Sequence, residues 1–213
     1  ISCSLVGSEM CIRDRGINAV KKMCKLLGEI DRIQPPIHEQ LGKGILEVTD
    51  IISSPYPGAS VVPEYCRATL DRRLLTGETR ESVLAPVQKL IDSLEKEDSE
   101  FSAKASFSVG SERCYTGAEI QGERFFPGWY YAPEEKYVQQ ILQKIREAGY
   151  DPELTQYSFC TNGSHYAGEK GIPTIGLGPS REDLAHMVDE YVELTQLYGA
   201  VECYYAVMEA LVL

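Results

Sequence analysis

Residues 44–75, GILEVTDIISSPYPGASVVPEYCRATLDRRLL, contain two strand-like segments and the turn between them. GILEVTDIIS and YCRATLDRRLL are rich in β-branched and apolar residues, whereas the link SPYPGASVVP carries the prolines and glycine of a turn. The stretch therefore predicts a hairpin, and the rest of the fold is worked out from it.

Amphipathic helices are predicted on both sides of this hairpin. GINAVKKMCKLLGEI at 16–30 has one apolar stripe, and a second helix after the GET of 77–79 has another. These stripes comprise Ile17, Val20, Cys24 and Leu27, then Val83, Val87, Leu90, Ile91 and Leu94. FSAKASFSV at 101–109 alternates apolar and polar residues, as a strand with one buried face does. The order helix, strand, strand, helix, strand is a split βαββαβ, or ferredoxin-like, unit whose first strand is missing.

The first fifteen residues, ISCSLVGSEMCIRDR, fit neither a helical nor a strand period over their length. They also lack the long apolar run of a secretory signal. LVGSEMCIRD is what a transposase-based sequencing-library adapter would encode. We therefore expect residues 1–15 to be an adapter-derived artefact, and the sequence that naturally precedes Gly16 to be missing.

From Thr116 the pattern changes. TGAEIQGERFFPGWYYAPE has no stable period and predicts a connector between domains. After it, short apolar segments alternate with helical ones, which predicts part of an α/β domain. The expected elements are a helix at Glu134–Ala148, a strand at Leu154–Phe159, a short helix at His165–Lys170, a strand at 172–178 (IPTIGLG) and a long helix from about Glu190. The predicted domains are therefore residues 16–122 and 123–213.

Composition narrows the class of protein. The formal net charge of -11 and the lack of a Lys/Arg cluster argue against nucleic acid or an anionic membrane as a partner. Outside residues 1–15 there are five widely spaced cysteines with no CxxC motif, which is typical of reduced thiols in a cytoplasmic protein. No segment is long and apolar enough to predict a transmembrane span.

Several motifs resemble those of the M20 metallohydrolases, the group of aminoacylases, acetylornithine deacetylases, succinyl-diaminopimelate desuccinylases and carboxypeptidases. GINAV at 16–20 is similar to the start of the first helix in their lid domain, and VVPEYCRATLDRR at 61–73 to a lid strand. TNG at 161–163, GIPTIGLGP at 171–179 and AHMVDE at 185–190 are similar, in order, to their C-terminal motifs. TNG looks most like the branch of selenium-metabolism hydrolases.

This resemblance implies a ferredoxin-like lid, or dimerisation, domain inserted in a zinc-peptidase-like α/β domain, of which residues 123–213 are the C-terminal part. It implies a homodimer joined through the lid domain. It also implies hydrolysis of small amide or peptide substrates by water activated between two metal ions, usually zinc.

The resemblance also implies roles for individual residues. His186 matches a metal ligand, whereas a lone histidine is more often structural. Arg73 matches the lid arginine that binds a substrate carboxylate, although Asp71 and Arg72 beside it could simply form surface ion pairs. Asn162 and Gly163 match substrate-binding positions, with a plain turn as the alternative. Gly178 would let its loop approach the substrate site closely, or would merely end a strand. Asp189 and Glu190 could instead begin the last helix, and Ser60 departs from the family's asparagine.

What the sequence lacks leads to the last expectation. The H-x-D motif, the bridging aspartate and the Glu-Glu pair that contains the general base do not occur, and their family positions all precede Gly16. We therefore expect no catalytic base here, and we expect the fragment to be inactive and not to hold its metals. One alternative is a stand-alone ferredoxin-like dimerisation or binding module. Another is a hydrolase that uses Cys160 with His165, although an unsupported Cys/His pair is usually structural. His38 has no predicted role.

Overall fold

The computed structural model describes residues 1–6, 16–57, 61–157 and 159–212. Its contacts divide the chain into two compact units, unit 1 (Ile1–Gly128) and unit 2 (Trp129–Leu213), which are described separately.

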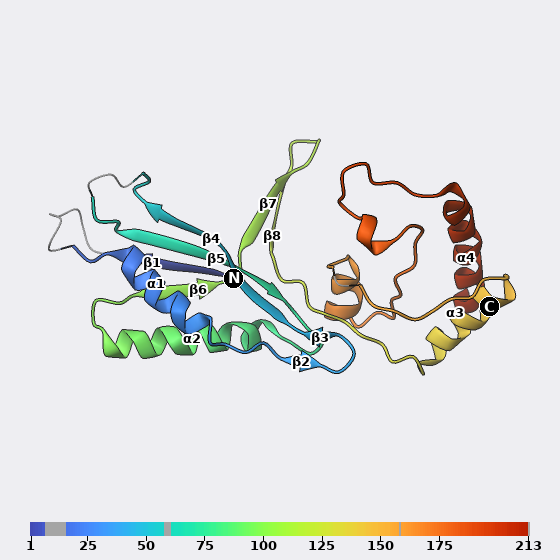
Figure 1. Cartoon of the computed structure of the whole chain (residues 1–213), viewed down its shortest axis with the longest axis horizontal. Coiled ribbons are helices and arrows are strands. Elements are labelled where there is room, and N and C mark those ends of the chain that lie inside the picture. Colours follow the sequence, from blue (N-terminus) through green and yellow to red (C-terminus); the bar gives the residue numbers. More distant parts are fainter. Residues whose placement is uncertain (7–15, 58–60, 158, 213) are drawn as a thin grey trace. The chain divides into compact units, whose positions relative to one another are not determined.

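Unit 1 is built on a four-stranded antiparallel sheet (Figure 1). The strands lie in the order β4 (Ile45–Ser54), β5 (Tyr65–Arg73), β1 (Ser2–Val6) and β6 (Ala103–Ser106). The predicted hairpin is therefore confirmed as β4–β5, with a register shift between Val48 and Asp50. This strand order with two crossing helices is the ferredoxin-like fold expected from the sequence.

The position of the first strand is occupied, which corrects the expectation that it is missing. Ser2–Val6 pairs with β5 on one side and β6 on the other, in the middle of the sheet. Ile1, Cys3 and Leu5 are buried, and burial raises the pKa of the Cys3 thiol to about 11. The alternation I-S-C-S-L was the strand signal; it is obscured when all fifteen residues are considered together. The other residues of the predicted artefact, 7–15, lie outside the described residues.

Two helices cover one face of this sheet, as Figure 1 shows. α1 (Ala19–Ile30) begins at Asn18, whose side chain accepts a hydrogen bond from the Lys21 amide. α2 (Arg80–Glu97) begins at Thr79 with a reciprocal capping box to Ser82. Their apolar stripes meet the sheet in one core that includes Met23, Leu26, Ile30, Val87 and Ile91. The amphipathic pattern thus predicted the positions of both helices and the buried stripe of α2. For α1 the predicted stripe was wrong, because the buried face is the neighbouring one, formed by Ala19, Met23, Leu26 and Ile30, and Cys24 is exposed.

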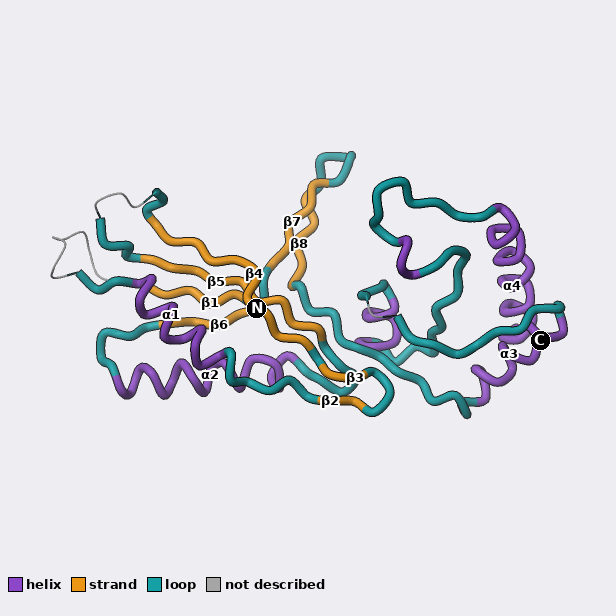
Figure 2. Tube along the Cα trace, viewed as in Figure 1, coloured by secondary structure: helices purple, strands orange, loops and turns teal. Residues whose placement is uncertain are grey.

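Two small hairpins complete unit 1 (Figure 2). One pairs β2 (Ile37–His38) with β3 (Gly42–Lys43), and the other pairs β7 (Val109–Arg113) with β8 (Glu119–Glu123). β8 lies in the segment expected to be an irregular connector. It is tied to α2 because Arg80 Nε donates to Glu123 Oε2 over 2.8 Å and the guanidinium stacks 4.2 Å from the Phe125 ring centroid.

Unit 2 contains two longer helices, α3 (Lys136–Glu147) and α4 (Leu194–Val212), packed through Ile141, Ile145, Cys203 and Ala206. A short π-helix, η1 (Ser164–Glu169), and a 3₁₀ turn, η2 (Glu182–Leu184), lie between them. The predicted strands 154–159 and 172–178 do not form among the described residues of this unit. A strand requires a hydrogen-bonded neighbour, and the described part of unit 2 supplies none to either segment.

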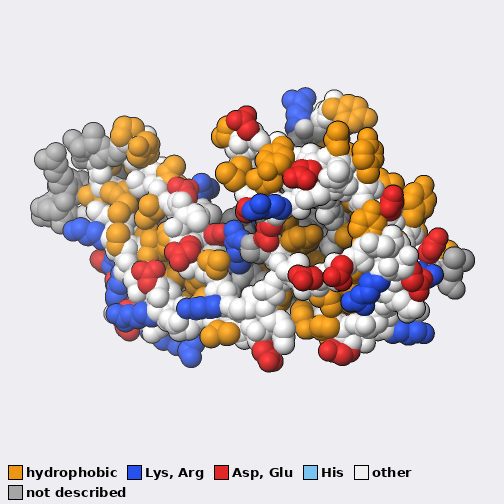
Figure 3. Space-filling model, turned by 45° about the vertical axis from the view of Figure 1, so that its right-hand side comes forward, with side chains coloured by type: hydrophobic (Ala, Val, Ile, Leu, Met, Phe, Trp, Pro, Cys, Tyr) orange, Lys and Arg blue, Asp and Glu red, His pale blue; other side chains and the backbone are white. Residues whose placement is uncertain are grey.

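Apolar side chains remain on the surface of unit 2, and Figure 3 shows such side chains gathered toward the right of the view. The exposed side of α4 carries many of them, including Leu194, Tyr198, Val201, Tyr205, Met208 and Leu211. Although α4 is largely apolar, no helix in the described parts of the chain has the length and hydropathy needed to span a bilayer.

Candidate functional site

Adjacent arginines at the end of β5 have opposite environments. Arg72 follows Cys66, Ala68 and Leu70 on the helix-covered face, and its side chain is 9% exposed. Arg73 points to the other face, where its side chain is 53% exposed and its Nε lies 4.0 Å from Asp71 Oδ2. The alternative of surface ion pairs therefore holds for Asp71, which lies beside Arg73, but not for Arg72, which is buried.

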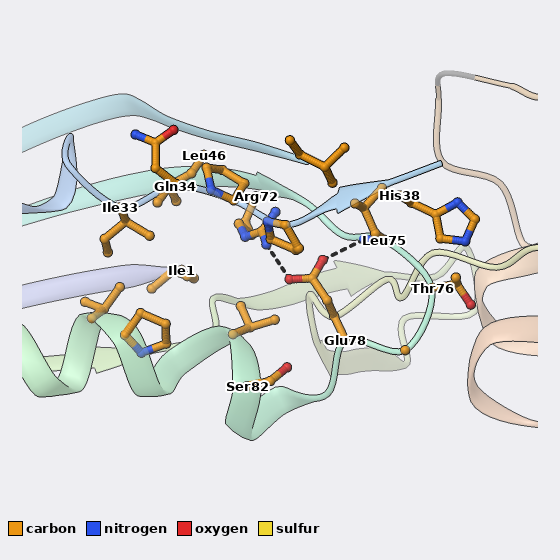
Figure 4. Close-up of a pocket in the computed structure, with 17 residues that line it drawn as sticks. Ile1, Ile33, Gln34, His38, Leu46, Arg72, Leu75, Thr76, Glu78 and Ser82 are labelled. Carbon is orange, nitrogen blue, oxygen red and sulfur yellow. Dashed lines mark hydrogen bonds and ion pairs between the residues drawn. The ribbon is translucent and has the colours of Figure 1, made fainter. Parts of the chain in front are cut away.

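A set of polar contacts, here called the Arg72 bracket, holds Arg72 in place, and Figure 4 shows the part of it that Glu78 makes with Arg72 and Leu75. Its guanidinium forms an ion pair with Glu78 and also donates to the carbonyls of Ile45, over 3.2 Å, and Arg73, over 2.7 Å. The second oxygen of Glu78 accepts from the Leu75 amide at 2.6 Å. The pair borders a cavity of about 410 Å³, lined by apolar residues from the 33–37 loop, β4 and α2. The sequence alone did not reveal this arrangement.

His186 lies in an exposed loop with unusual backbone geometry. His186 and Asp189 have φ values of 65° and 61°, and Ser180 has 78°; these are the non-glycine residues with positive φ in the described chain. Left-handed backbone is uncommon in non-glycine residues, although histidine and aspartate adopt it more readily than most, and residues with this backbone cluster at functional sites. The His186 amide donates to Glu190 Oε2 over 3.0 Å, which stabilises this loop.

Glu190 does not begin the last helix, contrary to the structural alternative. α4 starts at Leu194, and the Glu190 carboxylate folds back onto the His186 amide. The 180–190 loop is thus held by its own side chains: Ser180 Oγ also donates to the Tyr191 carbonyl over 3.1 Å.

Asn162 and Gly163 lie together at the start of η1. The Asn162 carbonyl accepts from the His165 amide at 3.0 Å, and the Gly163 amide donates to Thr161 Oγ1 at 3.2 Å. Gly163 is buried against Trp129, because a Cβ built there would lie 2.8 Å from the indole ring. Gly163 therefore has a packing role whether or not it contacts a substrate.

Aromatic residues of the FFPGWYYAPE segment support the same loops. Tyr131 donates from its hydroxyl to the Ile172 carbonyl over 2.8 Å and stacks edge-on with Tyr137 at 5.5 Å. Tyr137 donates to the Thr174 carbonyl over 3.4 Å, and burial raises its pKa to about 12. Sequence reasoning treated this segment as a connector; its density of aromatic residues was the signal of a structural role.

Gly178 has room around it, unlike its neighbour Gly176. A Cβ at Gly178 would have Tyr204 Oη as its nearest neighbour, at 3.8 Å, whereas one at Gly176 would collide with the Tyr157 ring. Tight packing of a glycine in this segment therefore occurs at Gly176, whereas the predicted approach of Gly178 to a substrate site stays a prediction.

The other candidates have local partners. Cys160 Sγ lies 3.4 Å from Ser164 Oγ, and His165 Nδ1 lies 2.9 Å from Glu169 Oε2. The ring of His38 accepts from the Gln40 and Leu41 amides at 3.2 Å, which fits a turn role. Ser60 lies outside the described residues.

Metal ligands do not gather in the described chain. No group of three or more His, Cys, Asp or Glu side chains in residues 1–6, 16–57, 61–157 and 159–212 could hold a metal ion.

Comparisons with known proteins agree with this fold. The peptidase dimerisation domain of the M20 family matches residues 12–99. The uncharacterized protein YgeY of Escherichia coli K12 is 32% identical over 198 residues, which is 91% of this chain and 47% of YgeY. The chain thus spans about half the length of this curated relative.

Solved structures with the same fold include aminopeptidase PepT of Bacillus cereus, with a TM-score of 0.68 and 16% identity, covering 98% of this chain and 50% of PepT. The YXEP protein of Bacillus subtilis, a dinuclear metal-binding M20 peptidase, has a TM-score of 0.63 and 12% identity, covering 100% and 49%. Residues 12–99 therefore match the dimerisation domain of M20 peptidases, and the chain shares the fold of these solved structures.

Proposed function

We propose that this chain is part of a metal-dependent hydrolase that cleaves amide bonds in small substrates bearing a carboxylate, such as N-acyl amino acids or peptides. The observation that carries the proposal is the left-handed backbone at His186, in the family's metal-ligand motif, within a loop held by Glu190. In this proposal His186 binds one of two metal ions, which are usually zinc in this family. Bound metal would lower the pKa of a bridging water.

The other predicted residues would bind substrate. Arg73, half-exposed on the open face of the sheet, would pair with the substrate carboxylate. Asn162, Gly163 and Gly178 would line the loops beside the reacting amide. The general base would come from a part of the protein that precedes the residues discussed here. The selenium-metabolism branch remains a prediction from the TNG motif.

We propose that the 213-residue chain alone is inactive and metal-poor, because one imidazole cannot hold a metal ion with useful affinity. The test starts from genomic DNA, from which the open reading frame around Gly16 is recovered and expressed in full. We expect zinc-dependent hydrolysis of an N-acyl amino acid panel by that protein, loss of activity in His186→Ala, and no turnover by the 213-residue chain. Stoichiometric tight zinc in the short chain would contradict its predicted inactivity.

A homodimer joined through unit 1 is also proposed. β4 is an edge strand of the sheet and exposes Ile45, Ile51 and Ile52, which is the kind of edge that pairs with another chain. Ile52→Lys should weaken self-association measured by sedimentation, whereas the matched change Val109→Lys on β7 should not.

Substrate class, cytoplasmic location and the absence of nucleic-acid or membrane partners remain expectations of the same proposal.

A stand-alone dimerisation or binding module is the second candidate, favoured by the closed core of unit 1. The recovered reading frame separates the two. An H-x-D motif and a Glu-Glu pair in frame upstream support the hydrolase, whereas a frame that encodes a first strand and a start codon but neither motif supports the module.

A further inference from the structure

Arg72 and Glu78 lie next to Arg73, the arginine proposed to bind substrate, and no comparison gives either of them a role. Strand alternation puts Arg72 on the helix-covered face and Arg73 on the open face, so consecutive residues share a backbone but not an environment. Any force that fixes the backbone at Arg72 also fixes the direction from which the Arg73 side chain leaves the sheet.

Such a force exists in the Arg72 bracket. Arg72 donates to the Arg73 carbonyl at 2.7 Å and to the Ile45 carbonyl at 3.2 Å, so one guanidinium joins the last residue of β5 to the first residue of β4. Glu78 pairs with Arg72 and accepts from the Leu75 amide at 2.6 Å. Together they fix the chain from Arg73 to Leu75, where it leaves the sheet for α2 (Figure 4).

The residues around Arg72 leave space for its guanidinium group. A Cβ at Gly44 would lie 2.8 Å from Arg72 Nη1 and 3.3 Å from the Arg73 carbonyl, so glycine leaves room for the guanidinium. Both charged side chains are nearly buried, at 9% and 12% exposure, and each therefore depends on the other for its charge to be compensated. A lysine ammonium cannot reproduce several contacts from one planar fork.

We propose that Glu78 and Arg72 are positioning residues that orient Arg73 for carboxylate binding. The inference rests on the proposed function, in which Arg73 pairs with the substrate carboxylate. Two-point recognition of a carboxylate tolerates displacements of only about 0.5 Å, and Asp71 lies near enough to Arg73 to compete with the substrate. A fixed backbone at Arg73 would favour the substrate in that competition.

The experiment uses the full-length protein with zinc and two substrates, an N-acyl amino acid and the same compound with its carboxylate converted to a carboxamide. The variants are Arg73→Ala, Glu78→Gln and Arg72→Lys, with Arg32→Gln, an exposed ion-pair change, as the control. We expect the ratio of kcat/KM for carboxylate over carboxamide to fall roughly 10- to 100-fold in all three test variants. The control should keep the wild-type ratio.

If Arg72 and Glu78 had a purely structural role, the variants would lower kcat/KM equally for both substrates and leave the ratio unchanged, which would overturn the inference. An unchanged ratio in Arg73→Ala would overturn it as well, because the carboxylate would then be bound elsewhere. If Glu78→Gln does not fold, Arg72→Lys, which keeps the charge, decides between these outcomes. A wild-type enzyme that hydrolyses neither substrate would instead show that the proposed function is wrong.

Discussion

Unit 1 and unit 2 have similar helices but very different interiors. In unit 1 a four-stranded sheet and two helices enclose a continuous core that includes Cys3, Leu5, Met23 and Ile91, all fully buried. In unit 2 the corresponding cluster consists of four residues between α3 and α4, and its two extended segments have no strand partner in the described chain. Similar local sequence patterns therefore form a paired sheet with a continuous core in unit 1, but extended segments without strand partners in the described part of unit 2.

The difference teaches that strand sequences need neighbours before they become a sheet. FSAKASFSV became β6 because β1 pairs with it, whereas IPTIGLG, which is at least as apolar, has no hydrogen-bonded neighbour. The apolar side chains that a neighbour would bury stay on the surface of unit 2. We infer that unit 2 is the less stable of the two.

Hydrogen exchange of the whole chain should show the difference between the two units most directly. Amides of β1, β5 and α2 should open only with global unfolding of unit 1, whereas those of α3 and α4 should open at lower cost. A gap of about 3 kcal/mol corresponds to about 100-fold in exchange rate. Mass spectrometry of peptides from both units measures it, and equal protection of the two units would contradict the comparison.

Much of unit 1 could be predicted from its sequence, because local periodicity and tertiary burial agree there. The two helices, the buried stripe of α2 and the β4–β5 hairpin were all visible in the residue pattern, whereas the stripe predicted for α1 lies beside the face that is buried. β1 was not, since its five residues are followed by a stretch with no period. Alternation of Cys66, Ala68 and Leu70 also predicts that Arg72, not Arg73, lies on the buried face, as it does.

The candidate site was less predictable. Motif order identified the loops of His186 and Asn162, but no pattern of residues could predict the left-handed backbone at His186 or the contact between Gly163 and Trp129. Such features depend on residues far apart in sequence. The glycine in close contact proved to be Gly176, because its neighbour is Tyr157, which lies well outside the motif.

A buried charge in the central strand should make unit 1 as unstable as we infer unit 2 to be. Leu5→Asp would bury an unpaired carboxylate between β5 and β6, and we expect it to cost about 4 kcal/mol or more. Ser4→Asp is the matched control, because Ser4 lies on the other face opposite Arg67 and Lys104, where a carboxylate is favourable. Circular dichroism during urea unfolding measures both. Equal stability of the two variants would mean that Ser2–Val6 is not the central strand.

A smaller effect is expected in unit 2 from the contact between Gly163 and Trp129. Gly163→Ala places a methyl group 2.8 Å from the indole and forces one of them to move, at a cost of about 1–3 kcal/mol. Gly178→Ala is the control, because its Cβ would meet Tyr204 Oη at an ordinary 3.8 Å. Trp129 is the single tryptophan of the chain, so its fluorescence during denaturation reports directly on this unit. If Gly163→Ala unfolds at the wild-type denaturant concentration with unchanged emission, the loop carrying Asn162 is not held by Trp129, and unit 2 is even more loosely packed than the comparison with unit 1 implies.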